Sequence, residues 1–308
     1  MKNGLSPKHF SRHILSFDAL FAYFSIKLTA PMKNTAYYIL VLAVLITVAS
    51  CSPKVMPYAA TNKVYNHQTD SLLEVFGRRQ PAMLVDSLGL PIPSEWIGTV
   101  NFNARKPNYV IIHYTAQDSL AQTIKTFTLV KPQVSAHYVV GKDGKVVHML
   151  NDYLRAWQAG VSKWGNMVDI NSSSIGIEID NNGFEPFTDA QVASLLRLLA
   201  RLKREYSIPA ANFIGHSDIA PGRKVDPNRY FPWQTLASQG FGLWYDTTGL
   251  QVPEGFNAVQ GLRIIGYNVK DSMAAIGSFK LHFVQQDSTK VLTDDERKII
   301  YDLMNKYQ

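Results

Sequence analysis

The chain has very little cysteine and no apolar stretch long enough to cross a membrane. Cys51 is the only cysteine among 308 residues, so no disulfide can form within the chain and the hydrophobic core must hold the fold. The most apolar run covers about a dozen residues, short of the ~20 that a transmembrane helix needs. Apolar residues make up 46% of the sequence, which is ample for a core and argues against wholesale disorder.

Signatures of nucleotide and nucleic-acid binding are also missing. There is no basic run with interleaved aromatic residues, no recognition-helix pattern and no Cys/His finger, so we expect no nucleic-acid partner. No glycine-rich loop of the kind that cradles phosphate is present either. The net charge of +7 favours an anionic partner, such as a membrane surface or an acidic wall polymer. Nothing in the sequence predicts a protein partner.

One polar loop, Gly215–Pro227, concentrates the reactive side chains. It holds His216, Lys224 and Asp226, and its prolines and Gly222 exclude one continuous helix. Imidazole and carboxylate are ordinary ligands of a transition metal, zinc above all. The segment taken alone is equally compatible with a polar surface loop that binds no metal.

Two apolar strands carry one further reactive residue each. His113 ends the β-branched run that starts at Tyr109, and Glu178 interrupts the apolar strand Ser174–Asp180. A carboxylate on so apolar a strand is costly to bury unless it is paired or its pKa rises, and a raised pKa suits a general base. The alternatives are that His113 is a satisfied core residue and that Glu178 points to solvent.

Together, in this order, these stretches resemble the type-2 N-acetylmuramoyl-L-alanine amidases, a family that includes the animal peptidoglycan recognition proteins. The likeness runs from about Val100 to Tyr245. Three further segments fit the family pattern: Ser135–Val140 as the second strand, Arg155–Ser162 as the substrate-cleft segment and Phe231–Trp233 as the segment that closes the domain.

The resemblance implies a fold, a cofactor and a reaction. The fold is α/β, a central mixed sheet flanked by helices. His113, His216 and Asp226 would bind one Zn²⁺ per catalytic domain, Glu178 would act as general base and acid, and Lys224 would stabilise the oxyanion. The implied reaction is hydrolysis of the amide that joins N-acetylmuramic acid to L-alanine in peptidoglycan or muropeptides, for cell-wall turnover or recycling.

Four residues are candidates for contacts with the substrate: Tyr114, His137, Trp157 and Gln158. His137 is also the nearest competitor as a metal ligand, although the resemblance favours a structural or cleft-lining role. Gln158 departs from the family pattern, which has histidine after the tryptophan, and this departure bears on substrate preference. Asn228 replaces the usual glycine after Asp-Pro, a change that touches loop geometry because asparagine tolerates positive φ.

The N-terminal region has the layout of a secretory signal. Met32 and Lys33 precede the apolar run Ala36–Ser50, which ends in small residues before Cys51. This resembles the lipobox of bacterial lipoproteins and implies a diacylated cysteine, with Ser52 pointing to the outer membrane and the periplasmic side of the cell envelope. The alternative is a free thiol after a plain membrane anchor. We expect Met32 to be the true start and the residues before it to be an upstream extension.

The chain divides into four predicted parts. Residues 1–51 are the upstream extension and signal peptide, 52–98 a proline-rich tether and lead-in, 99–248 the catalytic domain and 249–308 a small helical domain. In the tether, Asp70–Gly77 is expected to form one or two helical turns. In the catalytic domain we expect helices over Ser119–Leu129 and Thr188–Tyr206 and a hairpin of strands His137–Val140 and Val146–Leu150.

Three short helices are predicted after Gly249, over Gln260–Tyr267, Asp271–Gln285 and Thr293–Tyr307. They resemble the peptidoglycan-binding domain of several lipoprotein amidases of this family. The alternative is a helical cap on the catalytic domain.

Two other functions stay open from sequence: a peptidoglycan receptor that binds without cutting, and a zinc hydrolase of the same fold that acts on another amide. Non-catalytic members of the family typically lack part of the ligand set, whereas His113, His216, Asp226 and Glu178 are all present here.

Overall fold

The computed structural model describes residues 57–78 and 106–308. The chain forms two compact units, Met1–Gln80 and Pro81–Gln308, which are described separately. The predictions for the signal peptide, for lipidation of Cys51 and for most of the 52–98 tether lie outside the described residues. Within the described ranges, no helix combines the length and the apolar character that crossing a bilayer requires.

In the first unit the structure describes one helix, α3, over Ala59–Arg78. The helical structure predicted over Asp70–Gly77 is confirmed, but the helix is much longer than the one or two turns expected. The tether's prolines nearest to this helix are Pro57 and Pro81. None lies between them, so nothing interrupts the intrahelical hydrogen bonds.

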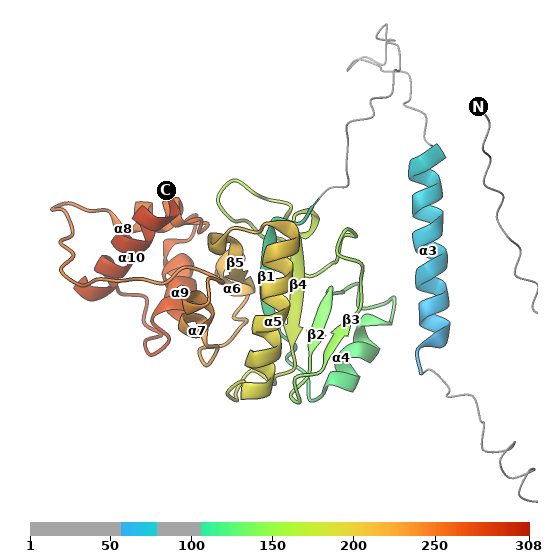
Figure 1. The fold of residues 1–308 in the computed structure, drawn as a ribbon. Helices are drawn as coiled ribbons and strands as arrows, with labels where there is room; N and C mark the ends of the chain where they lie inside the picture. Colours follow the sequence, from blue (N-terminus) through green and yellow to red (C-terminus); the bar gives the residue numbers. More distant parts are fainter. Residues whose placement is uncertain (1–56, 79–105) are drawn as a thin grey trace, which may run out of the picture. The chain divides into compact units, whose positions relative to one another are not determined.

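The second unit is built on a five-stranded mixed sheet with the strand order β3-β2-β4-β1-β5 (Figure 1). Strand β1 pairs in parallel with β4 and β5, and β2 pairs in parallel with β4 and antiparallel with β3. The predicted mixed α/β sheet is therefore confirmed. The strands are β1 Tyr109–Tyr114, β2 Tyr138–Val140, β3 Val146–His148, β4 Ser174–Ile179 and β5 Phe213–Gly215.

Two helices beside the sheet begin at the side chains that the sequence indicates. Ser119 caps α4, and the hydroxyl of Thr188 caps α5 in a reciprocal capping box with Gln191. A single helical turn, α6, starts the loop after β5. The helical segments here are α4 Leu120–Phe127, η1 Ile170–Ser172, α5 Asp189–Tyr206, η2 Ala210–Asn212, α6 His216–Ile219 and α7 Trp233–Ser238.

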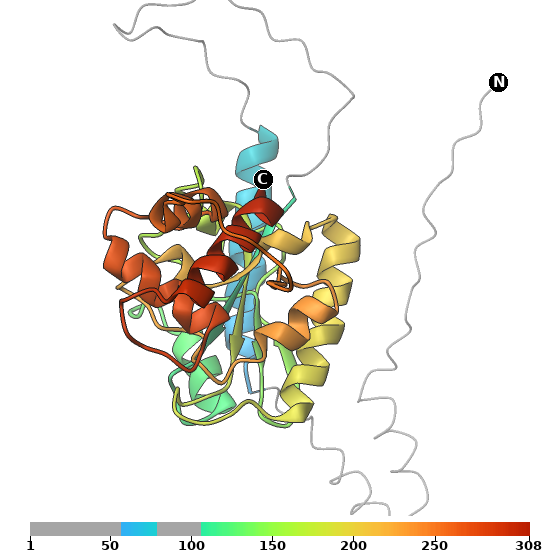
Figure 2. The same ribbon diagram turned by 90° about the vertical axis from the view of Figure 1, so that its left-hand side faces the viewer.

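Alternate residues of β1 face two different hydrophobic clusters. Val110 and Ile112 pack with the buried leucines of α5, whereas Ile111 packs with the C-terminal helices. Because side chains alternate along a strand, His113 shares the face of Ile111. The side chain of His113 therefore lies on the face of the sheet that the C-terminal helices cover (Figures 1 and 2).

The three predicted C-terminal helices are present as α8 Ala258–Ile265, α9 Ser272–Phe283 and α10 Asp294–Tyr307. They share one continuous core with the sheet, in which Ile111 and Ile214 meet Leu262, Phe279 and Leu303. Residues 249–308 thus pack against the sheet within one compact unit, as in the alternative of a helical cap.

Candidate metal centre and active site

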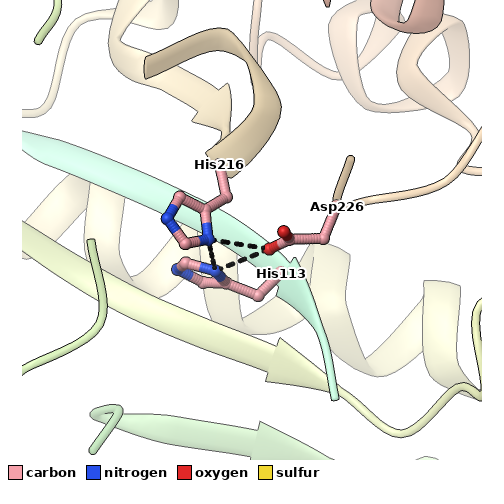
Figure 3. A group of neighbouring side chains, drawn as sticks. All are labelled: His113, His216 and Asp226. Atoms are coloured by element: carbon pink, nitrogen blue, oxygen red, sulfur yellow. Dashed lines mark hydrogen bonds and ion pairs between the residues drawn. The ribbon is translucent and has the colours of Figure 1, made fainter. Parts of the chain in front are cut away.

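The carboxyl ends of three parallel strands bring the predicted ligands together. His113, near the end of β1, lies opposite Glu178 of the neighbouring strand β4. On the other side of β1, strand β5 ends at Gly215, and His216 follows at once in α6. Such strand ends are where α/β sheets usually place their sites. Asp226 reaches the same point from the loop after α6 (Figure 3).

Three atoms that could each bind a metal ion form a nearly equilateral triangle. Nδ1 of His113 lies 2.9 Å from Nδ1 of His216 and 2.9 Å from Oδ2 of Asp226, and the third side, His216 Nδ1 to Asp226 Oδ2, is 3.0 Å. All three residues are buried. Atoms this close can share one ion at about 2.0–2.2 Å, the usual Zn–N and Zn–O distance.

The other nitrogen of His216 is committed to a backbone carbonyl. Nε2 lies 3.0 Å from the oxygen of Ala159, and the Arg223 guanidinium donates to that same oxygen at 2.7 Å. Since a carbonyl only accepts, Nε2 carries the proton of the neutral ring and Nδ1 presents a lone pair.

The other nitrogen of His113 is committed in the same way. Nε2 lies 2.6 Å from Oε1 of Gln158. The orientation of this amide follows from its neighbour, because the Ser174 hydroxyl donates to the oxygen of Ile170 and so must accept from Nε2 of Gln158, at 2.8 Å. Nδ1 of His113 therefore also presents a lone pair.

Three acceptors that face one another within 3.0 Å repel unless positive charge lies among them. Burial lowers the pKa of His113, but the negative charges of Glu178 and Asp226, together with hydrogen bonds to Asp226 and Gln158, outweigh burial and raise it above its ordinary value. The site thus attracts a cation, and its donor set, two imidazoles and one carboxylate, suits zinc.

Both remaining ligands favour the charge state that a metal requires. Burial, helped by the neighbouring His113, lowers the pKa of His216 to about 4, so its ring is neutral at pH 7. Burial alone would raise the pKa of Asp226, but hydrogen bonds and charge from His113 and His216 hold it well below its ordinary value. A neutral imidazole and an ionised carboxylate are the binding forms.

Glu178 lies beside the triangle with one oxygen unused. Its Oε2 is buried and has no hydrogen-bond partner within the described part of the chain. Burial raises the pKa of Glu178 to about 7, with His113 and Lys224 lowering it and Asp226 raising it. The carboxyl group can therefore take up and release a proton near neutral pH. The half-buried Lys224 is close enough for its charge to act on Glu178.

The four candidate substrate residues have different surroundings. Trp157 is 52% exposed and Tyr114 is half-buried near the charge of Asp226, so both are accessible. Gln158 is occupied with His113 and Ser174.

His137 is fully buried, and both of its ring nitrogens bond backbone groups, the N–H of Gly176 and the oxygen of Leu154. The structure therefore contradicts a substrate contact for His137 and gives it a structural role.

Sequence reasoning missed the groups that support the ligands. Oδ1 of Asn171 accepts from the backbone N–H groups of Gln158 and Ala159 and so fixes the segment that backs both histidines. The supporting role of Arg223, which bonds the Ala159 oxygen, was also missed. Its position next to Lys224, in the loop that carries two ligands, was the one sequence feature that could have indicated this role. No sequence pattern marks Asn171, because its role depends on a contact made only in the fold.

Comparison with known proteins gives consistent relatives. The family model described as N-acetylmuramoyl-L-alanine amidase matches residues 103–229. The chain is 35% identical to the N-acetylmuramoyl-L-alanine amidase AmiD of Escherichia coli over 210 residues, which are 56% of this chain and 74% of AmiD. It is 39% identical over 107 residues to the 1,6-anhydro-N-acetylmuramyl-L-alanine amidase AmpD of Haemophilus influenzae, 34% of this chain and 58% of AmpD.

Solved structures agree. AmiD of E. coli, in complex with anhydro-N-acetylmuramic acid-L-Ala-D-gamma-Glu-L-Lys, superposes with a TM-score of 0.60 at 28% identity and covers 73% of this chain and 98% of its own. AmpDh3 of Pseudomonas aeruginosa, in complex with anhydromuramic pentapeptide, gives a TM-score of 0.62 at 27% identity, with 71% and 99% covered.

Proposed function

Because the chain belongs to the type-2 N-acetylmuramoyl-L-alanine amidase family, we propose that it hydrolyses, with the help of zinc, the amide between N-acetylmuramic acid and L-alanine. Its substrates are peptidoglycan or the muropeptides released from it, and its role is cell-wall turnover or recycling. The observation that carries the proposal is the convergence of His113, His216 and Asp226 beside Glu178 at the carboxyl ends of the strands.

The metal would be held by Nδ1 of His113, Nδ1 of His216 and Oδ2 of Asp226, the three acceptors that face one another. When bound, zinc would polarise the scissile carbonyl and lower the pKa of a water molecule. The backing contacts of Gln158 and Ala159 keep both imidazoles in the tautomer that this requires.

Glu178 would move the proton. Its Oε2, which has no hydrogen-bond partner among residues 57–78 and 106–308, can accept a proton from the attacking water as the oxygen adds to the carbonyl carbon. The same carboxyl group would then donate that proton to the nitrogen of L-alanine as the C–N bond breaks. A pKa near 7 suits both directions of transfer.

Lys224 would stabilise the negative charge that develops on the carbonyl oxygen. Its half-buried side chain and its electrostatic influence on Glu178 support this role. Trp157 and Tyr114 would contact the substrate, because a large exposed indole beside the site offers an apolar face to a sugar or a peptide.

Location at the cell envelope is a separate part of the proposal. A signal peptide followed by a diacylated Cys51 would anchor the chain to the outer membrane, facing the periplasm. The C-terminal helices would add affinity for peptidoglycan.

The decisive experiment is digestion of purified muropeptides by the purified full-length chain, read by mass spectrometry. We expect release of the free stem peptide, loss of this activity with a chelator and recovery with zinc. Binding of muropeptides without cleavage, in protein shown to contain zinc, would overturn the proposed amidase activity and support the alternative of a peptidoglycan receptor.

A further inference from the structure

The turn that carries His216 contains a second carboxylate, which the mechanism does not use. Asp218 is completely buried, yet it belongs to α6, two residues after His216. Its Oδ2 accepts from the backbone N–H of Gly215 at 2.8 Å and from Nδ1 of His282 at 2.7 Å, and its Oδ1 accepts from the Tyr267 hydroxyl at 2.7 Å. A buried carboxylate persists only when it is satisfied in this way.

Two of these three donors come from the C-terminal helices. Tyr267 follows α8 and lies edge-on against Trp164, with ring centroids 5.1 Å apart. His282 belongs to α9, and its ring stacks on Trp233 at 3.8 Å with an angle of 14° between the planes. Aromatic packing therefore holds both donor side chains in place independently of their bonds to Asp218.

Asp218 in turn fixes the backbone just before His216, and a separate backbone bond holds the residue just after it. Its bond to Gly215 holds the residue before the ligand, and the N–H of Ser217 donates to the backbone oxygen of Asp226 at 2.8 Å. The fit is tight, since a Cβ on Gly215 would lie 3.1 Å from Oδ2 of Asp218. A shift of Asp218 would thus move His216 relative to the second ligand, Asp226.

We propose that Tyr267 and His282 are positioning residues of the metal centre, acting through Asp218 on His216. The proposal rests on the zinc site proposed above. It gives the C-terminal helices a part in metal binding that does not depend on any affinity for glycan. Loss of the Tyr267 hydroxyl leaves Oδ1 of the buried carboxylate without a donor, and loss of the His282 donor leaves Oδ2 with the Gly215 N–H alone. Either loss under-satisfies a buried charge, so the turn must rearrange.

The test separates the donor from the aromatic ring. In the full chain, His282→Phe keeps a ring to stack on Trp233 but removes the donor, whereas His282→Asn sacrifices the ring and keeps an amide donor near the place of Nδ1. Tyr267→Phe removes only a hydroxyl. The matched control is Tyr301→Phe, because Tyr301 packs edge-on against Phe256 among the same C-terminal helices and is not one of the donors to Asp218.

Zinc affinity is measured by competition with a chromogenic chelator, ligand geometry by the absorption spectrum of the cobalt-substituted protein, and folding by thermal unfolding in chelator. We expect His282→Phe and Tyr267→Phe to weaken zinc binding by roughly 10- to 100-fold and to change the cobalt spectrum. His282→Asn should recover most of the affinity, and Tyr301→Phe should match the parent chain.

Parental zinc affinity in both donor-deleted variants, with only thermal stability reduced, would reduce this contact to ordinary core packing and overturn the proposal. Failure of the unsubstituted chain to bind zinc at all would be a different result. It would overturn the zinc site of the proposed function, and this proposal with it.

Discussion

Among single residues, Glu178 is the most direct test of the mechanism. Glu178→Gln keeps the size of the side chain but removes the group that accepts and returns a proton. We expect kcat for muropeptide hydrolysis to fall by about 10²–10⁴, whereas zinc affinity measured with a competing chelator stays within a few-fold of the parent, because Glu178 is not among the three donors. A variant that keeps more than a tenth of the activity would remove Glu178 from the proton transfer.

Glu178 also predicts how activity depends on pH. Protonated Glu178 cannot accept a proton, so kcat/KM should fall as the pH is lowered through the pKa of this group. Burial raises that pKa to about 7. The positive charge of a bound zinc would lower it, so the fall in kcat/KM would occur at lower pH. A profile of kcat/KM from about pH 5 to pH 8 checks the sign. A rate that rises toward the acid end would contradict it.

The ligand set and the roles of the reactive residues came from the family resemblance, since residue types and spacing alone indicated only a metal site, and neither predicted the supporting contacts. His113 ends one apolar strand and Glu178 interrupts another, whereas His216 and Asp226 stand in one polar loop. The backing role of Gln158 depends instead on a bond to a residue 45 positions away. Such contacts leave no signal in the local sequence. For this reason Gln158 was expected only to contact the substrate and not to support His113.

At the scale of elements, strand β4 carries the proposed general base Glu178 and also, at Gly176, leaves room for the side chain of Gln158. A Cβ on Gly176 would lie only 2.6 Å from Cγ of Gln158, so Gly176→Ala must displace the side chain that backs His113. We expect zinc affinity to weaken by roughly 10- to 100-fold, measured by chelator competition.

Ile175→Val is the matched control for Gly176→Ala, because Ile175 precedes Gly176 on the same strand and packs in the opposite cluster. It should cost about 0.5–1.5 kcal/mol of stability and leave zinc affinity unchanged. Equal zinc affinities in the two variants would show that the gap at Gly176 is unimportant.

Helices and strands were predictable where local chemistry decides them. The capping boxes at Thr188 and Thr293 begin α5 and α10 where the sequence indicates. The full length of α3 was missed because its sequence has no strong apolar face, and only the lack of proline favours it. The packing of α8, α9 and α10 against the sheet was not predictable either, since it depends on which apolar faces meet.

On the scale of the whole second unit, the shared core changes the meaning of the C-terminal helices. Their apolar residues pack with Ile111 and Ile214 of the sheet, and two of their polar residues bond Asp218 beside a ligand. A detachable binding module would show neither feature. Metal binding and the folding of residues 249–308 should therefore be coupled.

This coupling predicts a single cooperative transition for residues 106–308. Leu303 is completely buried in the shared core, and Leu303→Ala should cost about 2–5 kcal/mol. Zinc release, followed with a chromogenic indicator, and loss of the near-UV circular dichroism signal should shift together to a lower temperature. Leu73→Ala in α3 is the control, because Leu73 is 64% exposed. If Leu303→Ala instead melts part of the chain while zinc stays bound at the parental temperature, the helices fold on their own and the coupling is absent.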